Sequence, residues 1–190
     1  MKLDFGCGPN KREGFLGVDS RPFDGKVDVV LDLAAKRIES TPNGVGGFIE
    51  QASFVPWPWE DNSVDEAHSA HFVEHLNAQE RIHFVNELYR ILKPGGKCQI
   101  IVPHWASCRA YGDLTHQWPP VSEFWFYYLA KDWRAANAPH NDGYICDFEA
   151  TWGYSFHPAM MVRNQEFQQF AMQFYKEAAQ DIICTLTARK

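Results

Sequence analysis

Short apolar runs that alternate with loops and helical segments are the feature that most constrains how this chain folds. They occur at residues 2–5, 15–19, 27–31, 64–68 and 97–102. Strands that are separated in this way by crossover segments form a mainly parallel sheet. We therefore expect an α/β fold whose core lies along that sheet.

One segment, residues 77–92, has the periodicity of an amphipathic helix. Asn77 and Glu80 have the spacing of a capping box, and Pro94 follows the last apolar residue, so the helix ends before it. A second helix is expected over residues 164–179, with a closing strand over 181–187. The apolar face of the first helix consists of residues spaced by three and four: Ile82, Val85, Leu88, Tyr89 and Leu92.

Length and composition predict one domain, residues 1–190, and disfavour several classes of protein. The formal net charge of −6 gives no overall attraction to nucleic acid or to anionic lipid. No apolar run approaches the length of a membrane span, and the chain leads from Met1 directly into a strand rather than into a signal peptide. We expect a cytoplasmic protein with no membrane partner, whose scattered cysteines are reduced thiols.

Half of the aromatic residues of the chain lie between residues 105 and 156. We interpret 104–156 as an aromatic cap inserted after the fifth strand, between a ligand-binding half at 1–103 and a closing helix and strand at 157–190. Rings from Trp118 to Tyr128, with Trp133, could stack on a planar ligand or enclose a methylated amine. The plainer alternative is that these rings form the core of the cap.

A glycine turn and two carboxylates follow the first three strands. Gly6 and Gly8 allow the backbone to approach a ligand closely and to present N–H donors, although a plain tight turn uses glycines as well. Asp19 ends the second strand, where a carboxylate can accept both hydroxyl protons of a ribose. Asp32 ends the third strand and can accept from an exocyclic amine or cap a turn. Parallel strands end at one edge of a sheet, so these groups predict a ligand site there.

A series of motifs between residues 3 and 103 resembles, in the same order, the motifs of class I methyltransferases that depend on S-adenosylmethionine (SAM). The resemblance is greatest to the methyltransferase type 11 group. The motifs are Asp4-Phe5-Gly6-Cys7-Gly8, Val18-Asp19, Asp32-Leu33, Trp57 to Asp65, His71 to Leu76 and Leu92 to Gly96.

The resemblance implies a Rossmann-like fold with three layers and a seven-stranded, mainly parallel sheet whose last strand is antiparallel. It also implies SAM as the cofactor. The backbone of Phe5, Gly6, Cys7 and Gly8 would hold the methionyl part, and Asp19 the ribose. The remaining implied contacts are Asp32 and Leu33 to adenine, with Ser69 and His71 lining the pocket after the fourth strand.

The chain departs from the family pattern between its first two strands, where only residues 6–14 are available. A parallel crossover usually takes a dozen or more residues, normally with a helix. We therefore expect a fold shortened at the N-terminus, with that helix reduced or missing. We hypothesise that the aromatic cap or the second subunit of a homodimer covers the cofactor instead.

Methyl transfer requires the acceptor to be aligned with the methyl group, and an oxygen or protonated nitrogen acceptor also requires a general base. The loop after the fifth strand faces the expected crevice. We predict His104 or His116 as the base and Asp113 as its orienting partner, with Tyr111 in the same catalytic segment. The alternative is that Asp113 caps a turn and that His116 is merely a hydrogen-bond partner of Asp113.

Two other chemistries are weighed against this prediction. His71-Phe72-Val73-Glu74-His75 has the H-x-x-E-H pattern of a zinc hydrolase, and on a helix its two histidines would share a face. No third ligand is indicated, so we expect no metal. A nicotinamide-dependent oxidoreductase is disfavoured because the glycine turn lacks the third glycine of that motif.

The predicted function is methyl transfer from SAM to a small-molecule or nucleobase-like acceptor by in-line displacement. The alternative is a SAM-binding sensor or partner subunit without catalysis.

Overall fold

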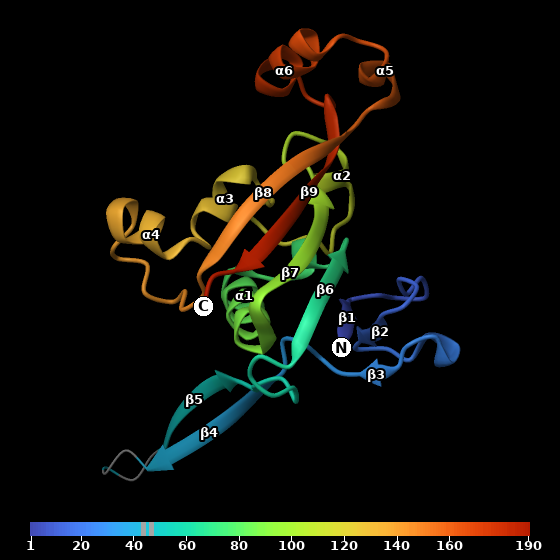
Figure 1. The fold of residues 1–190 in the computed structure, drawn as a ribbon. Coiled ribbons are helices and arrows are strands. Elements are labelled where there is room, and N and C mark those ends of the chain that lie inside the picture. Colours follow the sequence, from blue (N-terminus) through green and yellow to red (C-terminus); the bar gives the residue numbers. More distant parts are fainter. Residues whose placement is uncertain (43–44, 46–47) are drawn as a thin grey trace.

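A seven-stranded sheet forms the centre of the molecule (Figure 1). The computed structural model describes residues 1–42, 45 and 48–190. The strand order in this sheet is β3-β2-β1-β6-β7-β9-β8, and β4 and β5 form a separate hairpin. The strands are Lys2–Phe5 (β1), Leu16–Asp19 (β2), Val29–Val30 (β3), Lys36–Pro42 (β4), Phe48–Phe54 (β5), Val64–Ala70 (β6), Leu92–Pro103 (β7), Phe148–Phe156 (β8) and Ala179–Ala188 (β9).

The pairing within the sheet confirms the predicted mainly parallel arrangement. Strands β1, β2, β3, β6 and β7 pair in parallel, whereas the last strand, β9, is antiparallel to both of its neighbours, β7 and β8. All strands except β9 therefore run in one direction, and their carboxyl ends meet at a single edge of the sheet. We call this the carboxyl edge.

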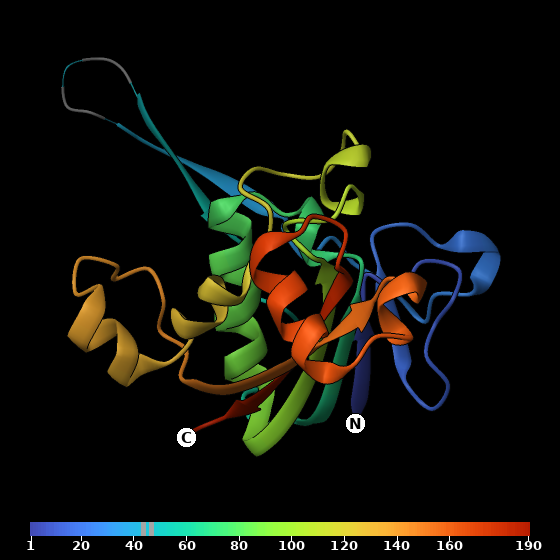
Figure 2. The ribbon, with the colours of Figure 1, turned by 90° about the horizontal axis from the view of Figure 1, so that it is seen from above.

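The helices are short apart from α1 and α6. None of the helices in the described ranges has the length and apolar character needed to cross a membrane. Seen from above, α5 and α6 lie over the carboxyl edge and α1 lies against one face of the sheet (Figure 2). The bounds are Ala78–Ile91 (α1), Arg109–Gly112 (α2), Glu123–Tyr127 (α3), Lys131–Asn137 (α4), Pro158–Met161 (α5) and Gln165–Phe174 (α6), with 3-10 turns at Phe23–Gly25 (η1) and Val73–His75 (η2).

Helix α1 forms where its periodicity predicts it. Asn77 accepts hydrogen bonds from the second and third amides of the helix, and the Glu80 side chain accepts from the Asn77 amide, so the capping box is present. The apolar face of α1 is buried against the sheet, and the Phe84 ring lies 5.8 Å from that of Phe5. The helix ends at Ile91 because Leu92 already belongs to β7.

Four segments differ from the sequence-based expectations. The closing helix α6 ends at Phe174 rather than at 179, and β9 begins earlier than expected, at Ala179. The hairpin β4–β5 was not anticipated, because β4 is exposed along its length and projects from the sheet (Figure 1). The region interpreted as an aromatic cap ends in β8, whose register is fixed by β9, about 30 residues further along the chain.

Candidate functional site

The turn after β1 confirms that the crossover to β2 contains no helix, because residues 6–15 form only turns and irregular backbone. Gly6 and Gly8 have left-handed backbones, with φ of +63° and +53°. The Gly6 amide donates to the Val18 carbonyl at 2.8 Å, which folds the turn back onto β2. A Cβ atom on Gly6 would lie 2.3 Å from the Phe72 side chain, whereas a Cβ atom on Gly8 would meet no atom within 4 Å. Gly8 therefore adjoins open space at the carboxyl edge.

Asp19 lies at the end of β2, beside this turn. Its two carboxylate oxygens accept from the amides of Gly8, at 3.0 Å, and Arg21, at 3.1 Å. These hydrogen bonds fix the orientation of the carboxylate, and each oxygen keeps a lone pair for a further donor. The arrangement suits recognition of vicinal hydroxyl groups.

Asp32 and Leu33 follow β3 in a tight turn. Oδ1 of Asp32 accepts from the amide of Ala34 at 2.9 Å, the hydrogen bond of a turn-capping aspartate. Leu33 is buried, and its carbonyl accepts from the indole of Trp57 at 3.0 Å. The structure thus shows the capping role of Asp32, and the exposed side chain keeps its second oxygen at the carboxyl edge.

Ser69 and His71 lie at and just beyond the end of β6. Ser69 pairs with Phe5 across the sheet, and its buried hydroxyl has no hydrogen-bond partner among the described residues. His71 has a left-handed backbone with φ of +53°, and its side chain is half-exposed. The carboxylate of Glu74, 3.4 Å from Nδ1, raises the pKa of His71 above its usual value.

These residues fit SAM as a ligand. A carboxylate for ribose hydroxyls, a buried serine hydroxyl without a partner and open space beside a glycine amide all lie where β1, β2 and β6 end. Asp19 and Gly8 adjoin accessible space, whereas Ser69 is fully buried, so contact of a ligand with its hydroxyl requires neighbouring atoms to move.

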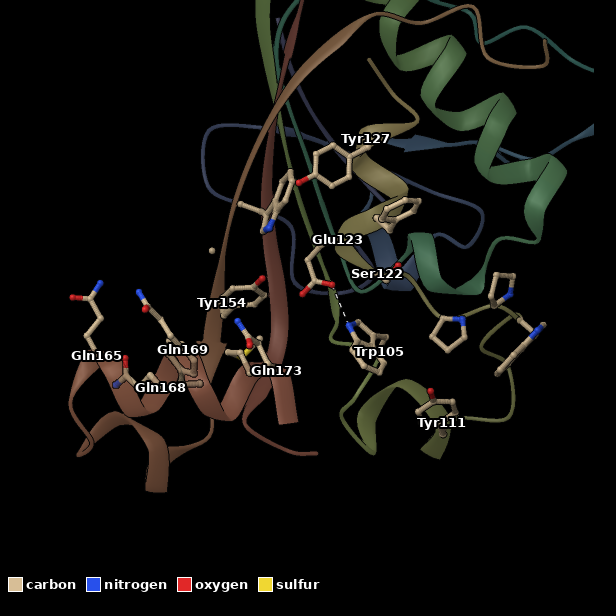
Figure 3. A pocket seen from close by; sticks show the side chains of 18 residues that line it. Trp105, Tyr111, Ser122, Glu123, Tyr127, Tyr154, Gln165, Gln168, Gln169 and Gln173 are labelled. Atoms are coloured by element: carbon tan, nitrogen blue, oxygen red, sulfur yellow. Dashed lines mark hydrogen bonds between the residues drawn. The ribbon is translucent and has the colours of Figure 1, made fainter. Parts of the chain in front are cut away.

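A cavity of about 1100 Å³, which we call the aromatic cavity, lies where β8 ends and α6 begins (Figure 3). Helix α6 contributes four glutamines to its wall, and rings from the region 105–156 form most of the rest. Among the described residues that line it, Glu123 alone carries a formal charge. The lining residues are Trp105, Tyr111, Trp118, Pro119, Pro120, Ser122, Glu123, Phe124, Tyr127, Trp152, Gly153, Tyr154, Phe156, Gln165, Gln168, Gln169, Met172 and Gln173.

Glu123 is held in place by two donors from the segment after β7. His104 is only 2% exposed, and its Nδ1 accepts from the amide of Ala106 at 3.1 Å. The proton of the neutral ring is therefore on Nε2, which donates to Oε1 of Glu123 at 3.0 Å. Trp105 donates from Nε1 to Oε2 at 3.1 Å.

The environment of Glu123 keeps it ionised. Burial by itself raises the pKa of Glu123, but the hydrogen bond from His104 leads a set of interactions that outweigh burial and hold the pKa below its ordinary value. Figure 3 shows the carboxylate between Trp105 and Tyr154. Burial and the negative charge of Glu123 raise the pKa of Tyr154 to about 12, so this phenol keeps its proton.

The other predicted catalytic residues divide between two places. Tyr111 lines the aromatic cavity together with Glu123. Asp113 accepts from the amide and hydroxyl of Thr115, at 2.8 and 2.7 Å, and so caps a turn. His116 donates from Nδ1 to the Ala110 carbonyl at 3.2 Å, and its ring lies 4.7 Å from that of His75. The structure therefore brings His116 to His75 rather than to Asp113.

Sequence reasoning missed Glu123. No local pattern marks this residue, which is an acidic side chain in the first turn of a five-residue helix. Its role depends on contacts with residues 18 and 19 positions earlier and with the end of β8.

The fold defines the chain as an α/β protein of the class I methyltransferase type. Residues 3–100 match the model of a methyltransferase domain family. The chain belongs to this family, the SAM-dependent methyltransferases, and is an enzyme with SAM as its cofactor. No curated protein matches the sequence closely enough to count as a relative.

Solved structures share the fold at low sequence identity. A SAM-dependent methyltransferase from Archaeoglobus fulgidus superposes with a TM-score of 0.61 at 18% identity, over 98% of this chain and 85% of that one. A possible histamine N-methyltransferase from Thermotoga maritima gives 0.56 at 14%, over 99% and 82%. The 1,6-didemethyltoxoflavin-N1-methyltransferase of Burkholderia thailandensis gives 0.53 at 12%, over 100% and 71%.

Proposed function

We propose that this methyltransferase acts on a small, planar acceptor bound in the aromatic cavity, with Glu123 as the proton acceptor. The observation that carries the proposal is a single ionised carboxylate in a cavity walled by aromatic rings. Rings of this kind stack on flat heterocycles, including nucleobase-like ones. The side-chain amides of the four glutamines of α6 can bind polar substituents of the acceptor and so fix its orientation.

The cofactor is assigned to the carboxyl edge. Gly6 and Gly8 would adjoin its methionyl part, Asp19 would accept from its ribose hydroxyls, and Ser69 would offer its free hydroxyl. Asp32, Leu33, Phe5, Cys7 and His71 complete the proposed set. When bound, SAM supplies an electrophilic methyl group on a sulfonium sulfur. The aromatic cavity lies at the β8 end of the same carboxyl edge and shares no lining residue with the cofactor set, so the proposal requires the acceptor to extend from the cavity toward β6 and β1.

Glu123 has the protonation state and position of a general base. Glu123 would take the O–H or N–H proton that the acceptor loses on methylation, while the methyl–sulfur bond of the donor would break to leave S-adenosylhomocysteine. His104 acts through Glu123 as a positioning residue, because both of its ring nitrogens are engaged. Tyr111 lines the cavity and can orient the acceptor, whereas His116 and Asp113 contribute through the loop that carries Trp118.

Two solved structures that share this fold support the proposal that the acceptor is a small molecule. The Thermotoga protein is named as a possible histamine N-methyltransferase, and the Burkholderia enzyme was crystallised with 1,6-didemethyltoxoflavin. We extend only the size class of these acceptors to this chain.

The experiment has two stages. Calorimetric titration with SAM and with its demethylated product, S-adenosylhomocysteine, tests the cofactor site, and Asp19→Ala is expected to weaken binding at least tenfold. Formation of S-adenosylhomocysteine with fractionated metabolites then tests catalysis. Glu123→Gln is expected to lower kcat by about 10²–10⁴-fold with unchanged SAM affinity. The matched control is Glu149→Gln, an exposed glutamate on β8.

The outcomes separate the two functions. Tight SAM binding with no turnover on any fraction would favour the alternative, a SAM-binding sensor or partner subunit. Turnover that Glu123→Gln leaves intact would refute the role of Glu123. Size-exclusion chromatography with and without SAM tests whether a homodimer covers the cofactor, and fractionation of cells tests the expected cytoplasmic location.

A further inference from the structure

Glu74, in the turn η2 after β6, is a buried carboxylate without a hydrogen-bond partner. The residue is 4% exposed, and neither of its carboxylate oxygens takes part in a hydrogen bond within the described ranges. His71 approaches Oε1 to 3.4 Å, but the contact is not aligned as a hydrogen bond. A buried carboxylate whose ion-pair partner, His71, is half-exposed and makes no aligned hydrogen bond is costly, so a further positive group is expected to complete it.

The nearest buried cation does not serve this purpose. The guanidinium of Arg81 donates to the backbone carbonyls of Val73, Pro119 and Gln117, at 3.2, 2.6 and 3.1 Å. Its third nitrogen also approaches the backbone carbonyl of Glu74 rather than the carboxylate. Arg81 therefore organises the loop around Glu74 and makes no hydrogen bond to the carboxylate oxygens.

Two imidazoles converge on this carboxylate. One donor atom from each of Glu74, His75 and His116 lies within 4.8 Å of the other two. Glu74 and His75 are neighbours in η2, whereas His116 comes from the loop after α2, about 40 residues further along the chain. The three side chains therefore meet only in the folded protein.

The hydrogen bonds of the two histidines fix which ring nitrogen is free. Nδ1 of His116 faces the carbonyl of Ala110 at 3.2 Å, and a carbonyl can only accept, so this nitrogen carries the proton. Nδ1 of His75 faces Oγ1 of Thr115 at 2.9 Å. That hydroxyl already donates its proton to Asp113 at 2.7 Å, so His75 must be the donor here as well.

Both neutral rings therefore keep an unprotonated Nε2. A protein holds a metal-ligating imidazole in this way, with its other nitrogen donating to a carbonyl or to a hydroxyl that is itself fixed by a carboxylate. The chain from His75 through Thr115 to Asp113 is such a support. It gives the turn-capping Asp113 a role in orienting His75.

We propose that Glu74, His75 and His116 bind one divalent transition-metal ion, with zinc as the best match. Two imidazole nitrogens and one carboxylate oxygen are a common zinc ligand set, and nitrogen ligands disfavour magnesium and calcium. Zinc bonds of about 2.0–2.2 Å bring tetrahedral donors to about 3.4 Å apart, so binding requires these donor atoms, which lie within 4.8 Å of one another, to move closer. The fourth position remains for water or an acceptor atom.

This site differs from the one considered in the H-x-x-E-H pattern. His71 is not in the cluster, because η2 is a 3-10 turn that begins after a left-handed residue rather than a helix that would bring both histidines to one face. The third ligand, which the sequence did not indicate, is His116.

An ion at this position would also stabilise one wall of the aromatic cavity. His116 lies between Tyr111 and Trp118, two residues that line the cavity. An ion bound by Glu74, His75 and His116 ties this cavity wall to the end of β6. Removal of the ion is therefore expected to loosen the wall while the sheet stays folded.

The test requires neither SAM nor an acceptor, so it is independent of the proposed function. The full-length protein is freed of metal with a chelator and titrated with Co²⁺, whose visible absorption reports its coordination, and then with Zn²⁺ in competition. We expect one equivalent of Co²⁺ with nitrogen–oxygen coordination, displaced by Zn²⁺. His75→Ala and His116→Ala are each expected to weaken binding more than 100-fold, and Thr115→Val, which removes only the support of His75, about 10–100-fold.

The matched control is His140→Ala, because His140 is exposed and lies outside the cluster. Circular dichroism establishes that each variant is folded, and should Glu74→Gln fail to fold, the two histidine variants still decide the question. Wild-type affinity no higher than that of His116→Ala would overturn the proposal. So would a thiolate-to-cobalt charge-transfer band, because it would place the ion on a cysteine such as Cys108 instead.

Discussion

Replacing Gly6 with alanine tests how closely the turn after β1 approaches Phe72. Gly6 has φ of +63°, and the added Cβ would lie 2.3 Å from Cγ and Cδ2 and 2.5 Å from Cβ of Phe72. These atoms form the base of that side chain, so rotation of the ring does not remove the clash. Gly8 provides the matched control, since its φ of +53° is similar and no atom lies within 4 Å of its added Cβ.

The two substitutions separate backbone strain from crowding. A left-handed backbone costs an alanine about 1–2 kcal/mol, which applies at both positions. Crowding in a packed region costs about 1–3 kcal/mol more and applies only at Gly6. Gly6→Ala is therefore expected to lower the free energy of unfolding by about 2–5 kcal/mol and Gly8→Ala by about 1–2 kcal/mol. For a chain of this length each kcal/mol corresponds to a Tm change of about 2–4 °C.

Urea and thermal unfolding of both variants provide the measurement, and Phe72→Ala completes a double-mutant cycle with Gly6→Ala. The cycle should show that Gly6→Ala costs about 1–3 kcal/mol less when Phe72 is absent. Equal destabilisation by Gly6→Ala and Gly8→Ala, together with no coupling to Phe72, would refute the close approach.

Three further outcomes follow from the structure. Asn77→Ala removes the cap of α1 and should lower the free energy of unfolding by about 1 kcal/mol in urea. Phe84→Ala removes the ring that packs against Phe5 and Trp57 and should lower the free energy of unfolding by about 3–5 kcal/mol in the same assay. A decrease below about 1 kcal/mol would contradict the packing. The depressed pKa of Glu123 adds stability above its ordinary pKa of 4.5 that is lost as the pH falls through the lower, folded-state value. Glu123→Gln should therefore lose less stability than wild type between pH 7 and pH 3, as measured by urea unfolding at each pH.

Local sequence patterns predicted the strands and the helix in which buried apolar residues recur at regular spacing. The strands that end at Phe5 and Asp19, and helix α1 with its capping box, follow from apolar spacing and from turn chemistry within a few residues. The missing helix between β1 and β2 followed from chain length alone, because nine residues do not allow a helical crossover. These features also placed the residues proposed to bind the cofactor at one edge of a parallel sheet.

The hairpin β4–β5 and strand β8 could not be predicted in the same way. The exposed β4 has no apolar face that would mark it as a strand, and its pairing with β5 satisfies the backbone away from the core. The rings of Phe148, Trp152 and Tyr154 stand at alternate positions of strand β8, so they lie on one face, and Trp152 and Tyr154 line the aromatic cavity. Its aromatic content therefore indicated a cap rather than a strand.

The sequence by itself determined the parallel sheet, the glycine turn and the carboxylates that follow β2 and β3, because strand direction and short-range spacing are properties of neighbouring residues. Only the tertiary structure decided that His104 supports Glu123, and that His116 joins Glu74 and His75. Each of these contacts joins segments separated by about 20–40 residues. Hydrogen bonds and metal ligands depend on positions in space to within a fraction of an ångström, and local sequence patterns do not specify how distant loops pack together.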